Sequence, residues 1–359
     1  MSKPLHIWYD GVIWSRQTMG GVNRYFARII DGLSEDIFPT LTVECLRDIN
    51  FPGNPKLHVV PCTRKGKEAV RWIDCDIFHP TYFEMLSYGD ILQARAPVVL
   101  TVHDTLHELY PELADPDGEQ RAWKKRLIPA VDHIICVSEN TKKDVMKIFG
   151  VPSDRIDVVY HASDLSWAKC EPVLRQNNAP YFLYVGHRYC YKNVPRLLQA
   201  ISTIRSGFPG VQLIFTGDPF TDKELQMMAA LGLSEAVQHV GRVSDPQLAG
   251  LYYEAVALVY PSLYEGFGLP VLEAMSCKCP VIASNSSSIP EVAGDAGLLI
   301  DPLETDALAD AMKRVLANPA LRAKMVDRGL QRSRLFSWEK AVEKTISVYQ
   351  RLAATRYLA

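Results

Sequence analysis

The chain has 359 residues, of which 48% are hydrophobic, and a formal net charge of −2 at pH 7. This length and composition suffice for a hydrophobic core and for more than one domain. The near-neutral charge gives no reason to expect a nucleic acid as a partner. The eight cysteines lack paired zinc-ligand spacing, so we expect free thiols in a reducing cytoplasm.

No targeting or membrane-spanning segment is expected. The apolar run near the N-terminus, residues 5–9, is too short for a signal peptide. No stretch approaches the roughly 18 apolar residues that a membrane-spanning helix needs. These features predict a cytoplasmic protein.

The first half of the chain alternates short β-prone runs with helical patterns. A loop is predicted over residues 10–18, and Ser138 is predicted to cap a helix over 139–149. The strands are predicted over residues 5–9, 41–46, 57–60, 76–78, 97–104 and 130–137, and a helix over 22–30.

Two features of this half are candidates for ligand binding. Gly20 and Gly21 open the helix after the first strand, which is typical of a phosphate-binding turn, although a glycine pair is more often a simple turn. The pair is not the G-x-G-x-x-G fingerprint, which counts against a dehydrogenase. His103 ends the run over 97–104, where ligands of open α/β sheets bind; a lone histidine there is more often structural. Asp104 is expected to orient the loop.

A polar, proline-containing stretch over residues 163–180 predicts the boundary between two domains. Strands and helices alternate again after it, so we expect two doubly wound α/β domains with parallel sheets over residues 1–168 and 169–338, followed by a terminal helix over 339–359. Strands are predicted over 181–186, 211–217, 255–260, 280–284 and 297–300, and helices over 194–204, 245–254, 305–317, 319–335 and 337–357.

The most informative stretch is residues 260–275, Y-P-S-L-Y-E-G-F-G-L-P-V-L-E-A-M. It predicts a buried strand, a glycine turn and a helix with proline in its first turn. Such a turn directs backbone N–H groups and the positive end of the helix dipole towards an anionic ligand. Glu265 on the turn and Glu273 in the helix are placed to reach one bound molecule. For an isolated glutamate pair, two solvated acids at a helix N-terminus would be the simpler interpretation.

A second loop carries cations. His187, Arg188, Lys192 and Asn193 follow the strand predicted over 181–186. Arginine offers a bidentate fork and lysine a compact charge, which suits a pyrophosphate. Loops of this composition are usually only solvated.

The stretch 260–275 resembles the Glu-x7-Glu signature of the retaining GT-B glycosyltransferases, and the similarity continues through C-P-V-I-A-S (279–284) and S-I-P-E-V-A-G (288–294). The resemblance implies a GT-B fold, in which two Rossmann-like domains face each other across a cleft. The second domain would bind a nucleotide sugar, and the first would bind the acceptor. The terminal helix would pack back on the N-terminal domain.

The resemblance also implies roles for single residues. Glu273 would hold the donor ribose, while Lys192 and Arg188 would neutralise the diphosphate. The family's arginine usually stands at the place of His187, so Lys192 is the firmer assignment. The remaining donor-binding residues would be Gly20 and Gly21 over the diphosphate, Val243 beside the base, and Glu265, Gly266, Phe267, Gly268 and Leu269 at the sugar. Glu265, His103, Lys192 and Arg188 would be catalytic.

Neither a metal nor another cofactor is expected, because GT-B enzymes generally need none. Asp74-Cys-Asp76 and Asp115-Pro-Asp117 match the short D-x-D pattern of metal-dependent transferases, but chance matches to so short a pattern are expected. Relatives with lipid acceptors dock on membranes through basic patches, and the stretch from Arg121 to Arg126, R-A-W-K-K-R, is a candidate for such peripheral contact at the inner face of the membrane. A solvated helix face is the simpler alternative.

The predicted function is therefore transfer of a hexose with retention to a glycan or lipid-linked glycan acceptor, in polysaccharide or lipopolysaccharide biosynthesis. GDP-mannose is the first choice of donor, because Arg188 and Tyr191-Lys192-Asn193 resemble a bacterial mannosyltransferase branch. UDP-glucose or another UDP-sugar is the alternative. A nucleotide-sugar epimerase and an inactive donor-binding scaffold stay open as further classes.

Overall fold

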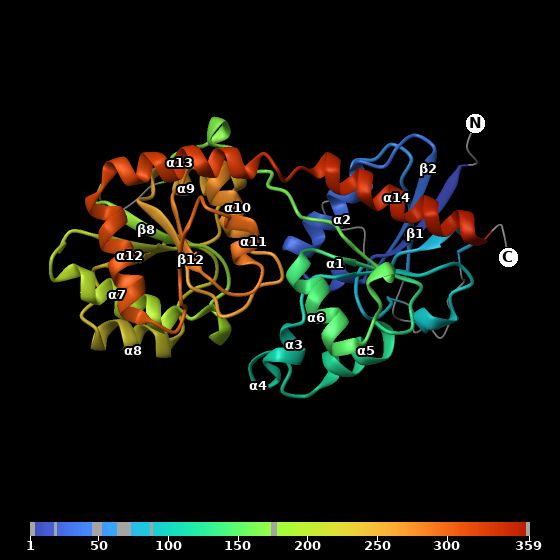
Figure 1. The fold of residues 1–359 in the computed structure, drawn as a ribbon, viewed down its shortest axis with the longest axis horizontal. Coiled ribbons are helices and arrows are strands. Elements are labelled where there is room, and N and C mark those ends of the chain that lie inside the picture. Colours follow the sequence, from blue (N-terminus) through green and yellow to red (C-terminus); the bar gives the residue numbers. More distant parts are fainter. Residues whose placement is uncertain are drawn as a thin grey trace. The chain divides into compact units, whose positions relative to one another are not determined.

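The computed structural model describes residues 4–17, 20–44, 52–62, 73–86, 89–173 and 178–356. The chain forms two compact units (Figure 1). The first comprises Met1–His161 together with Ser337–Ala359, and the second comprises Ala162–Phe336. The chain changes unit at 161/162 and at 336/337, a few residues before the predicted boundaries at 168/169 and 338/339.

The first unit is built on parallel strands. β3 (His58–Pro61), β2 (Ile37–Val43), β1 (Leu5–Asp10) and β4 (Ile77–Phe78) pair in that order. A bridge between Phe78 and Val98 continues the sheet to β5 (Val99–Val102), β6 (His133–Cys136) and β7 (Ile156–Val158). Strand β1 has β2 on one side and β4 on the other, so the chain reverses its direction of winding there, and such a switch point is where open α/β sheets bind ligands.

Alternation along β1 explains why helices cover both faces of this sheet. Ile7 and Tyr9 pack into one hydrophobic cluster with residues of α2 (Gly21–Asp31) and α14 (Trp338–Arg356). Trp8 points to the opposite face, into a cluster that contains Leu127 and Val145. The other described α-helices of this unit are α1 (Val12–Arg16), α3 (Leu106–Leu109), α4 (Pro111–Ala114), α5 (Glu119–Leu127) and α6 (Glu139–Phe149).

The terminal helix α14 belongs to the first unit and packs against α2 and β4. Its Tyr349 is fully buried, with its hydroxyl 2.9 Å from the hydroxyl of Tyr9 and 2.6 Å from Nδ1 of His79. Nε2 of His79 lies 2.8 Å from Oγ1 of Thr101. Burial lowers the pKa of His79 to about 3, so this hydrogen-bonded chain holds α14 with a neutral histidine.

The second unit has one six-stranded parallel sheet in the order β10-β9-β8-β11-β12-β13. Its first strand, β8, lies between β9 and β11, so the switch point falls between β8 and β11. The strands are β8 (Tyr181–Tyr184), β9 (Gln212–Phe215), β10 (Val237–His239), β11 (Ala257–Tyr260), β12 (Val281–Ser284) and β13 (Leu298–Ile300). The helices are α7 (Val194–Arg205), α8 (Asp222–Ala230), α9 (Asp245–Glu254), α10 (Leu269–Ser276), α11 (Ile289–Ala293), α12 (Thr305–Ala317) and α13 (Pro319–Ser333).

The predicted doubly wound α/β architecture is confirmed in both units. The loop predicted over residues 10–18 is wrong in part, because α1 forms within it, and Thr18 lies outside the described residues. Strand β2 begins at Ile37, earlier than predicted. Leu46, the predicted end of this strand, and Tyr357, the predicted end of the last helix, lie outside the described residues. Within the described ranges, no helix is both long and apolar enough to cross a membrane.

Candidate active site

Two residues far apart in the sequence meet at the switch point of the second unit. Lys192 ends a short 3-10 turn after β8, and Glu265 lies on the turn after β11. The Nζ of Lys192 lies 2.6 Å from Oε1 of Glu265 and donates to the hydroxyl of Tyr260 over 3.0 Å. The two side chains of the pair are only 12% and 11% exposed. A largely desolvated ion pair therefore lies where parallel sheets bind their ligands.

The backbone after Glu265 has the predicted form. Gly268 adopts φ 93° and ψ 48°, a left-handed conformation that glycine takes without strain. Helix α10 starts at the next residue and carries Pro270 in its first turn. Gly268 has no side chain that could cap the helix, Pro270 carries no N–H, and the N–H of Val271 donates to the carbonyl of Gly268 over 3.0 Å. The start of α10 therefore offers a ligand mainly the positive end of the helix dipole.

The position of Glu265 is fixed by two serines that the sequence analysis did not single out. The N–H of Glu265 donates to Oγ of Ser287 over 2.9 Å, and Oγ of Ser288 donates to the carbonyl of Glu265 over 2.9 Å. Ser287 has φ 52°, an uncommon conformation for a residue with a side chain. The sequence signals for this contact are the serine run before α11 and the stretch S-I-P-E-V-A-G (288–294), which begins at Ser288.

Glu273 lies inside the second unit, on α10. It is 6% exposed, and its Oε2 accepts a hydrogen bond of 3.1 Å from the hydroxyl of Tyr252. Burial and the nearby Glu273 carboxylate raise the pKa of Tyr252 well above its usual value, so the tyrosine stays a donor. Tyr252 was not identified from the sequence; it is one residue of the helix predicted over 245–254.

Arg188 is not brought together with Lys192. Its Nε lies 2.6 Å from Oε1 of Glu224, and its Nη1 and Nη2 donate to the carbonyls of Asp218 and Pro219 over 2.9 and 2.6 Å. The side chain is 6% exposed. The guanidinium thus ties the loop after β8 to the start of α8, and its role at a diphosphate stays a prediction. His187 is exposed and lies beside Asp218.

Four more predicted donor-binding positions lie on loops or at the start of a helix. Val243 is half-buried between Gly241, whose φ is 73°, and the capping residue of α9, Ser244. Phe267 is buried against Phe336, with ring centroids 5.8 Å apart. In the first unit, Gly20 is the N-cap of α2 and Gly21 its first residue, and both are exposed.

His103 follows β5 and packs edge-on against Tyr25, with ring centroids 5.3 Å apart. Burial lowers its pKa to about 4, so the ring is neutral at pH 7. Its Nε2 is buried without a hydrogen-bond partner among the described residues. His103 lines a cavity of about 250 Å³ in the first unit, which also involves Gln17, Asp104, His107 and Lys124.

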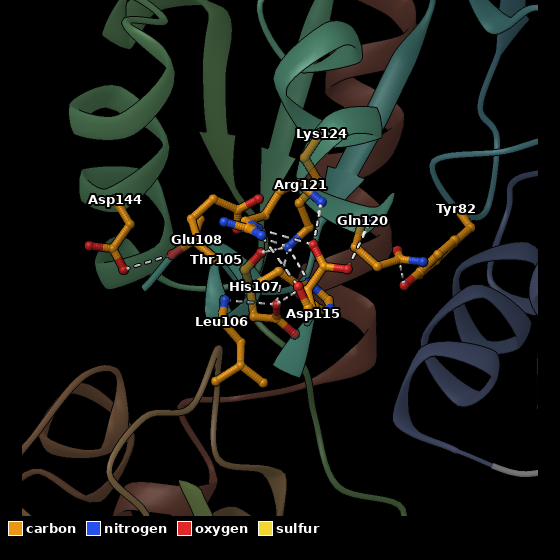
Figure 2. A network of polar contacts seen from close by, with 11 residues as sticks. Tyr82, Thr105, Leu106, His107, Glu108, Asp115, Gln120, Arg121, Lys124 and Asp144 are labelled. Atoms are coloured by element: carbon orange, nitrogen blue, oxygen red, sulfur yellow. Dashed lines mark hydrogen bonds and ion pairs between the residues drawn. The ribbon is translucent and has the colours of Figure 1, made fainter. Parts of the chain in front are cut away.

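The basic stretch on α5 is neither a continuous basic patch nor a fully solvated helix face. Lys124 is 1% exposed, and its ammonium donates to Oε2 of Glu108 over 3.2 Å (Figure 2). It also donates to the carbonyl of Asp104 over 3.0 Å. Arg121 pairs with Asp115 over 3.2 Å. Lys124 is therefore not part of a solvated or membrane-facing basic surface. Lys125 and Arg126 are exposed, and Arg126 pairs with Asp90; membrane contact through this stretch stays a prediction. Lys124 stands three and four positions before the buried Leu127 and Ile128, a spacing that would have placed it on the inner face of the helix.

The D-x-D matches have structural contacts. Oδ1 and Oδ2 of Asp115 accept hydrogen bonds of 3.1 and 2.9 Å from the N–H groups of Gln120 and Arg121 at the start of α5. Oδ2 of Asp76 accepts one of 2.9 Å from the N–H of His6. Among the described residues, no group of three or more histidine, cysteine, aspartate or glutamate side chains is arranged to hold a metal ion.

The sequence matches known families along most of its length. Residues 19–167 match the model described as Glycosyltransferase Family 4, and residues 166–332 match Glycosyl transferases group 1. The O-antigen chain mannosyltransferase B of Escherichia coli is 36% identical, over 71% of this chain and 70% of that protein. The MMP alpha-(1->4)-mannosyltransferase of Mycolicibacterium hassiacum is 27% identical, over 78% and 72%.

Solved structures agree on the fold. Sucrose-phosphate synthase from Thermosynechococcus elongatus superimposes with a TM-score of 0.76 at 22% identity, over 98% of this chain and 99% of that one. Anabaena HepE, solved in complex with UDP-glucose, superimposes with a TM-score of 0.74 at 18% identity, over 97% and 99%.

Proposed function

Because the chain belongs to the glycosyltransferases of group 1 and family 4, we propose that it transfers mannose from GDP-mannose, with retention, to a glycan or lipid-linked glycan acceptor. Its two Rossmann-like units have the GT-B fold. The observation that carries the proposal is the Lys192–Glu265 pair beside the N-terminus of α10.

Lys192 is the proposed electrostatic catalyst. Its ammonium is held close to a carboxylate and a phenol, so it is already positioned when a donor enters. A diphosphate that replaces the Glu265 carboxylate at Nζ meets a cation in a site of low exposure, where charge stabilisation is strong. Departure of the nucleoside diphosphate leaves negative charge on its oxygens, and Lys192 and the positive end of the α10 dipole stabilise that charge.

Glu265 and Glu273 are proposed to hold the donor at its two ends. Glu265, released from Lys192, accepts hydrogen bonds from sugar hydroxyls, together with the backbone of residues 266–269. Glu273 accepts from the ribose hydroxyls, and its contact with Tyr252 orients the carboxylate. Both roles fit carboxylates, since a carboxylate is acceptor-only and a vicinal diol offers two donors.

We assign further roles to His103, Gly20 and Gly21 in the first unit and to Arg188 in the second. His103, neutral at pH 7, contacts the transferred sugar through Nε2. Gly20 and Gly21 present backbone N–H groups to the phosphates. Arg188 positions the loop that carries Lys192, through its contacts with Glu224 and the residues before α8. Positive charge from Lys192 and α10 supports a reaction that needs no metal.

The choice of mannose is supported by the two relatives named above, both of which are mannosyltransferases by name. UDP-glucose is the alternative donor, and the complex of Anabaena HepE with it is the observation in favour. At 18% identity that likeness concerns the fold, so GDP-mannose has the stronger support. An O-antigen or related polysaccharide pathway is the corresponding biological setting.

Localisation is part of the proposal. The seven described cysteines are free, which suits the reducing cytoplasm. Contact with the inner face of a membrane would now rest on Lys125 and Arg126, the exposed residues of the basic stretch. Two cations contribute only about 1 kcal/mol each near an anionic surface, so such contact is weak.

The test is calorimetric titration with GDP-mannose, GDP, UDP-glucose and UDP, each with Mg²⁺ and with EDTA. Micromolar binding of the guanine pair alone, unchanged by EDTA, is the expected result. Preference for the uridine pair would overturn the choice of donor, and binding that needs Mg²⁺ would overturn the metal-free mechanism.

A second assay separates transferase from the other classes. Incubation of GDP-mannose with a mannose-containing acceptor, followed by proton NMR of the product, is expected to give an α-anomer, the configuration of the donor. A β-linked product would overturn retention. An isomerised donor without acceptor would indicate an epimerase, and tight binding without turnover a scaffold.

A further inference from the structure

Three consecutive serines lie beside the turn that carries Glu265. They occupy positions 286–288, in the loop between β12 and α11. Each of the three side chains forms a hydrogen bond with the backbone of the turn after β11. The contacts proposed above for the nucleotide sugar do not involve these serines.

Two of the serines hold Glu265 from both sides. The N–H of Glu265 donates to Oγ of Ser287 over 2.9 Å, and Oγ of Ser288 donates to the carbonyl of Glu265 over 2.9 Å. Ser288 is fully buried, and the other two residues are half-buried, so water competes little for these hydrogen bonds. The peptide groups on either side of Glu265 therefore cannot rotate without breaking a hydrogen bond.

Leu263, two residues earlier, connects the same turn to the loop that carries Lys192. Oγ of Ser286 donates to the carbonyl of Leu263 over 3.0 Å, and the N–H of Leu263 donates to the carbonyl of Tyr191 over 2.8 Å. Tyr191 directly precedes Lys192. The turn after β11 is thus fixed between the serine loop and the loop of its ion-pair partner, and all of these residues belong to the second unit.

Ser287 adopts a backbone conformation that is strained for a residue with a side chain. Its φ is 52°, in the left-handed region that glycine enters without strain. Strained residues persist where the surrounding structure holds them, and they concentrate at functional sites. The group that Ser287 contributes is its hydroxyl, which accepts the N–H of Glu265. A glycine at this position would relieve the strain and remove that acceptor.

Glu265 changes partner in the proposed reaction. In this structure its Oε1 lies 2.6 Å from Nζ of Lys192, and in the reaction it accepts from sugar hydroxyls instead. With a free backbone, release from the lysine would also shift the glycine turn over residues 266–268. Because the backbone is held, the exchange needs only rotation about the side-chain bonds of Glu265, and the rest of the turn stays preorganised.

We propose that Ser287 and Ser288 are positioning residues for the transfer: they hold the backbone of Glu265, so that binding of the nucleotide sugar moves only its carboxylate away from Lys192. The inference rests on the proposed function, because it concerns the glutamate assigned to the transferred sugar. Both serines act through Glu265 and need no contact with the sugar themselves.

The variants Ser287→Gly and Ser287→Ala separate positioning from stability. Both lose the acceptor of the Glu265 N–H, but only glycine relieves the strain. Both are expected to lower kcat at least ~10-fold, as for a misplaced group in a site, with a smaller change in KM because the ribose and diphosphate contacts remain. Thermal unfolding is expected within ~2 °C of the wild type for Ser287→Gly, and ~2–4 °C lower for Ser287→Ala.

Ser202→Ala is the matched control. It removes a hydrogen bond of 3.0 Å from Oγ to the carbonyl of Leu231, elsewhere in the same unit, and is expected to keep the wild-type kcat. Rates are measured with whichever of GDP-mannose and UDP-glucose the wild type uses. Wild-type kcat in Ser287→Gly, or a loss of activity only in the less stable Ser287→Ala, would overturn the inference. A wild-type chain that transfers neither sugar would overturn the proposed function, and the inference with it.

Hydrogen exchange of the Glu265 amide tests the inference without turnover. The amide is expected to be protected in the wild type, both alone and with saturating GDP-mannose, and to exchange at least ~10-fold faster in Ser287→Gly. Loss of protection when the nucleotide sugar binds would contradict the inference, because the backbone would then move together with the carboxylate.

Discussion

Each unit contains a lysine that pairs with a glutamate at low exposure, Lys124 in the first unit and Lys192 in the second, but the two ammonium groups have different surroundings. Lys124 is 1% exposed and has two carboxylates, a carbonyl and an imidazole around its ammonium. Lys192 is 12% exposed and pairs with a single carboxylate at the edge of a sheet, beside the start of a helix. An ammonium has three protons, so Lys124 is fully occupied by its own unit, whereas Lys192 can exchange one partner for a ligand. Burial and the number of partners, rather than the residue type, distinguish the structural Lys124 from Lys192, the cation proposed for catalysis.

The largest effect is expected for Lys124→Met. Removal of the ammonium leaves the nearly buried carboxylate of Glu108, and the partly exposed one of Asp104, without their cation, which costs about 3 kcal/mol of unfolding free energy. Urea unfolding of this variant and of Lys125→Met measures it. The neighbouring Lys125 is exposed, so its substitution is expected to change stability by less than about 0.5 kcal/mol. Equal stability of both variants would remove the distinction between the two lysines.

Lys192→Ala tests the other side of the comparison. Loss of the proposed electrostatic donor is expected to lower kcat at least ~100-fold, with thermal unfolding within a few degrees of the wild type. Lys313→Ala, at a lysine of α12 that pairs only with a neighbouring aspartate among the described residues, is expected to turn over normally. Near-normal kcat for Lys192→Ala, measured at saturating donor, would refute its role at the diphosphate.

Arg188→Ala sharpens the comparison within one loop. The guanidinium is engaged by Glu224, which is 19% exposed, and by two carbonyls. The variant is therefore expected to lose about 2 kcal/mol of unfolding free energy, as for loss of hydrogen bonds to a charged group, and less than ~10-fold in kcat. Glu224→Gln should show a similar loss of stability. If kcat instead falls as far as in Lys192→Ala, Arg188 leaves Glu224 for the diphosphate when donor binds.

The last prediction concerns the pH dependence of stability. Burial lowers the pKa of His79 from 6.5 to about 3, so the unfolded chain takes up a proton before the folded one does. The neutral ring makes its full contribution to the free energy of unfolding above about pH 6.5. As the pH is lowered from 6.5 to about 3, this contribution decreases by up to about 1.4 kcal/mol per pH unit. In His79→Asn the slope between pH 6 and 4 is expected to be smaller by that amount, as measured by urea unfolding. His58→Asn, at an exposed histidine of β3, should keep the wild-type slope; an unchanged slope in His79→Asn would contradict the prediction.

Much of the fold was predictable because local signals agreed with tertiary packing. Helix α9 runs over Asp245–Glu254 and α12 over Thr305–Ala317, as their periodicity and their flanking residues predict. Ser138 caps α6, because its Oγ accepts a hydrogen bond of 3.0 Å from the N–H of Thr141. The start of β2 was missed because Pro39 lies in it, and proline is rare inside a strand. The short α1 gives too few residues for a periodic pattern.

The sequence by itself determined two doubly wound units, the glycine turn before α10 and the residue types that suit an anionic ligand, because hydrophobic period and backbone conformation are local properties. Only the tertiary structure decided that Lys192 meets Glu265 across 73 positions, that Arg188 turns to Glu224, and that Lys124 is buried. The identity of a charged residue in the sequence does not tell whether its side chain is solvated, ion-paired or available to a ligand. Its partners come from strands and helices that are distant in sequence, and the order of the strands in the sheet brings them together.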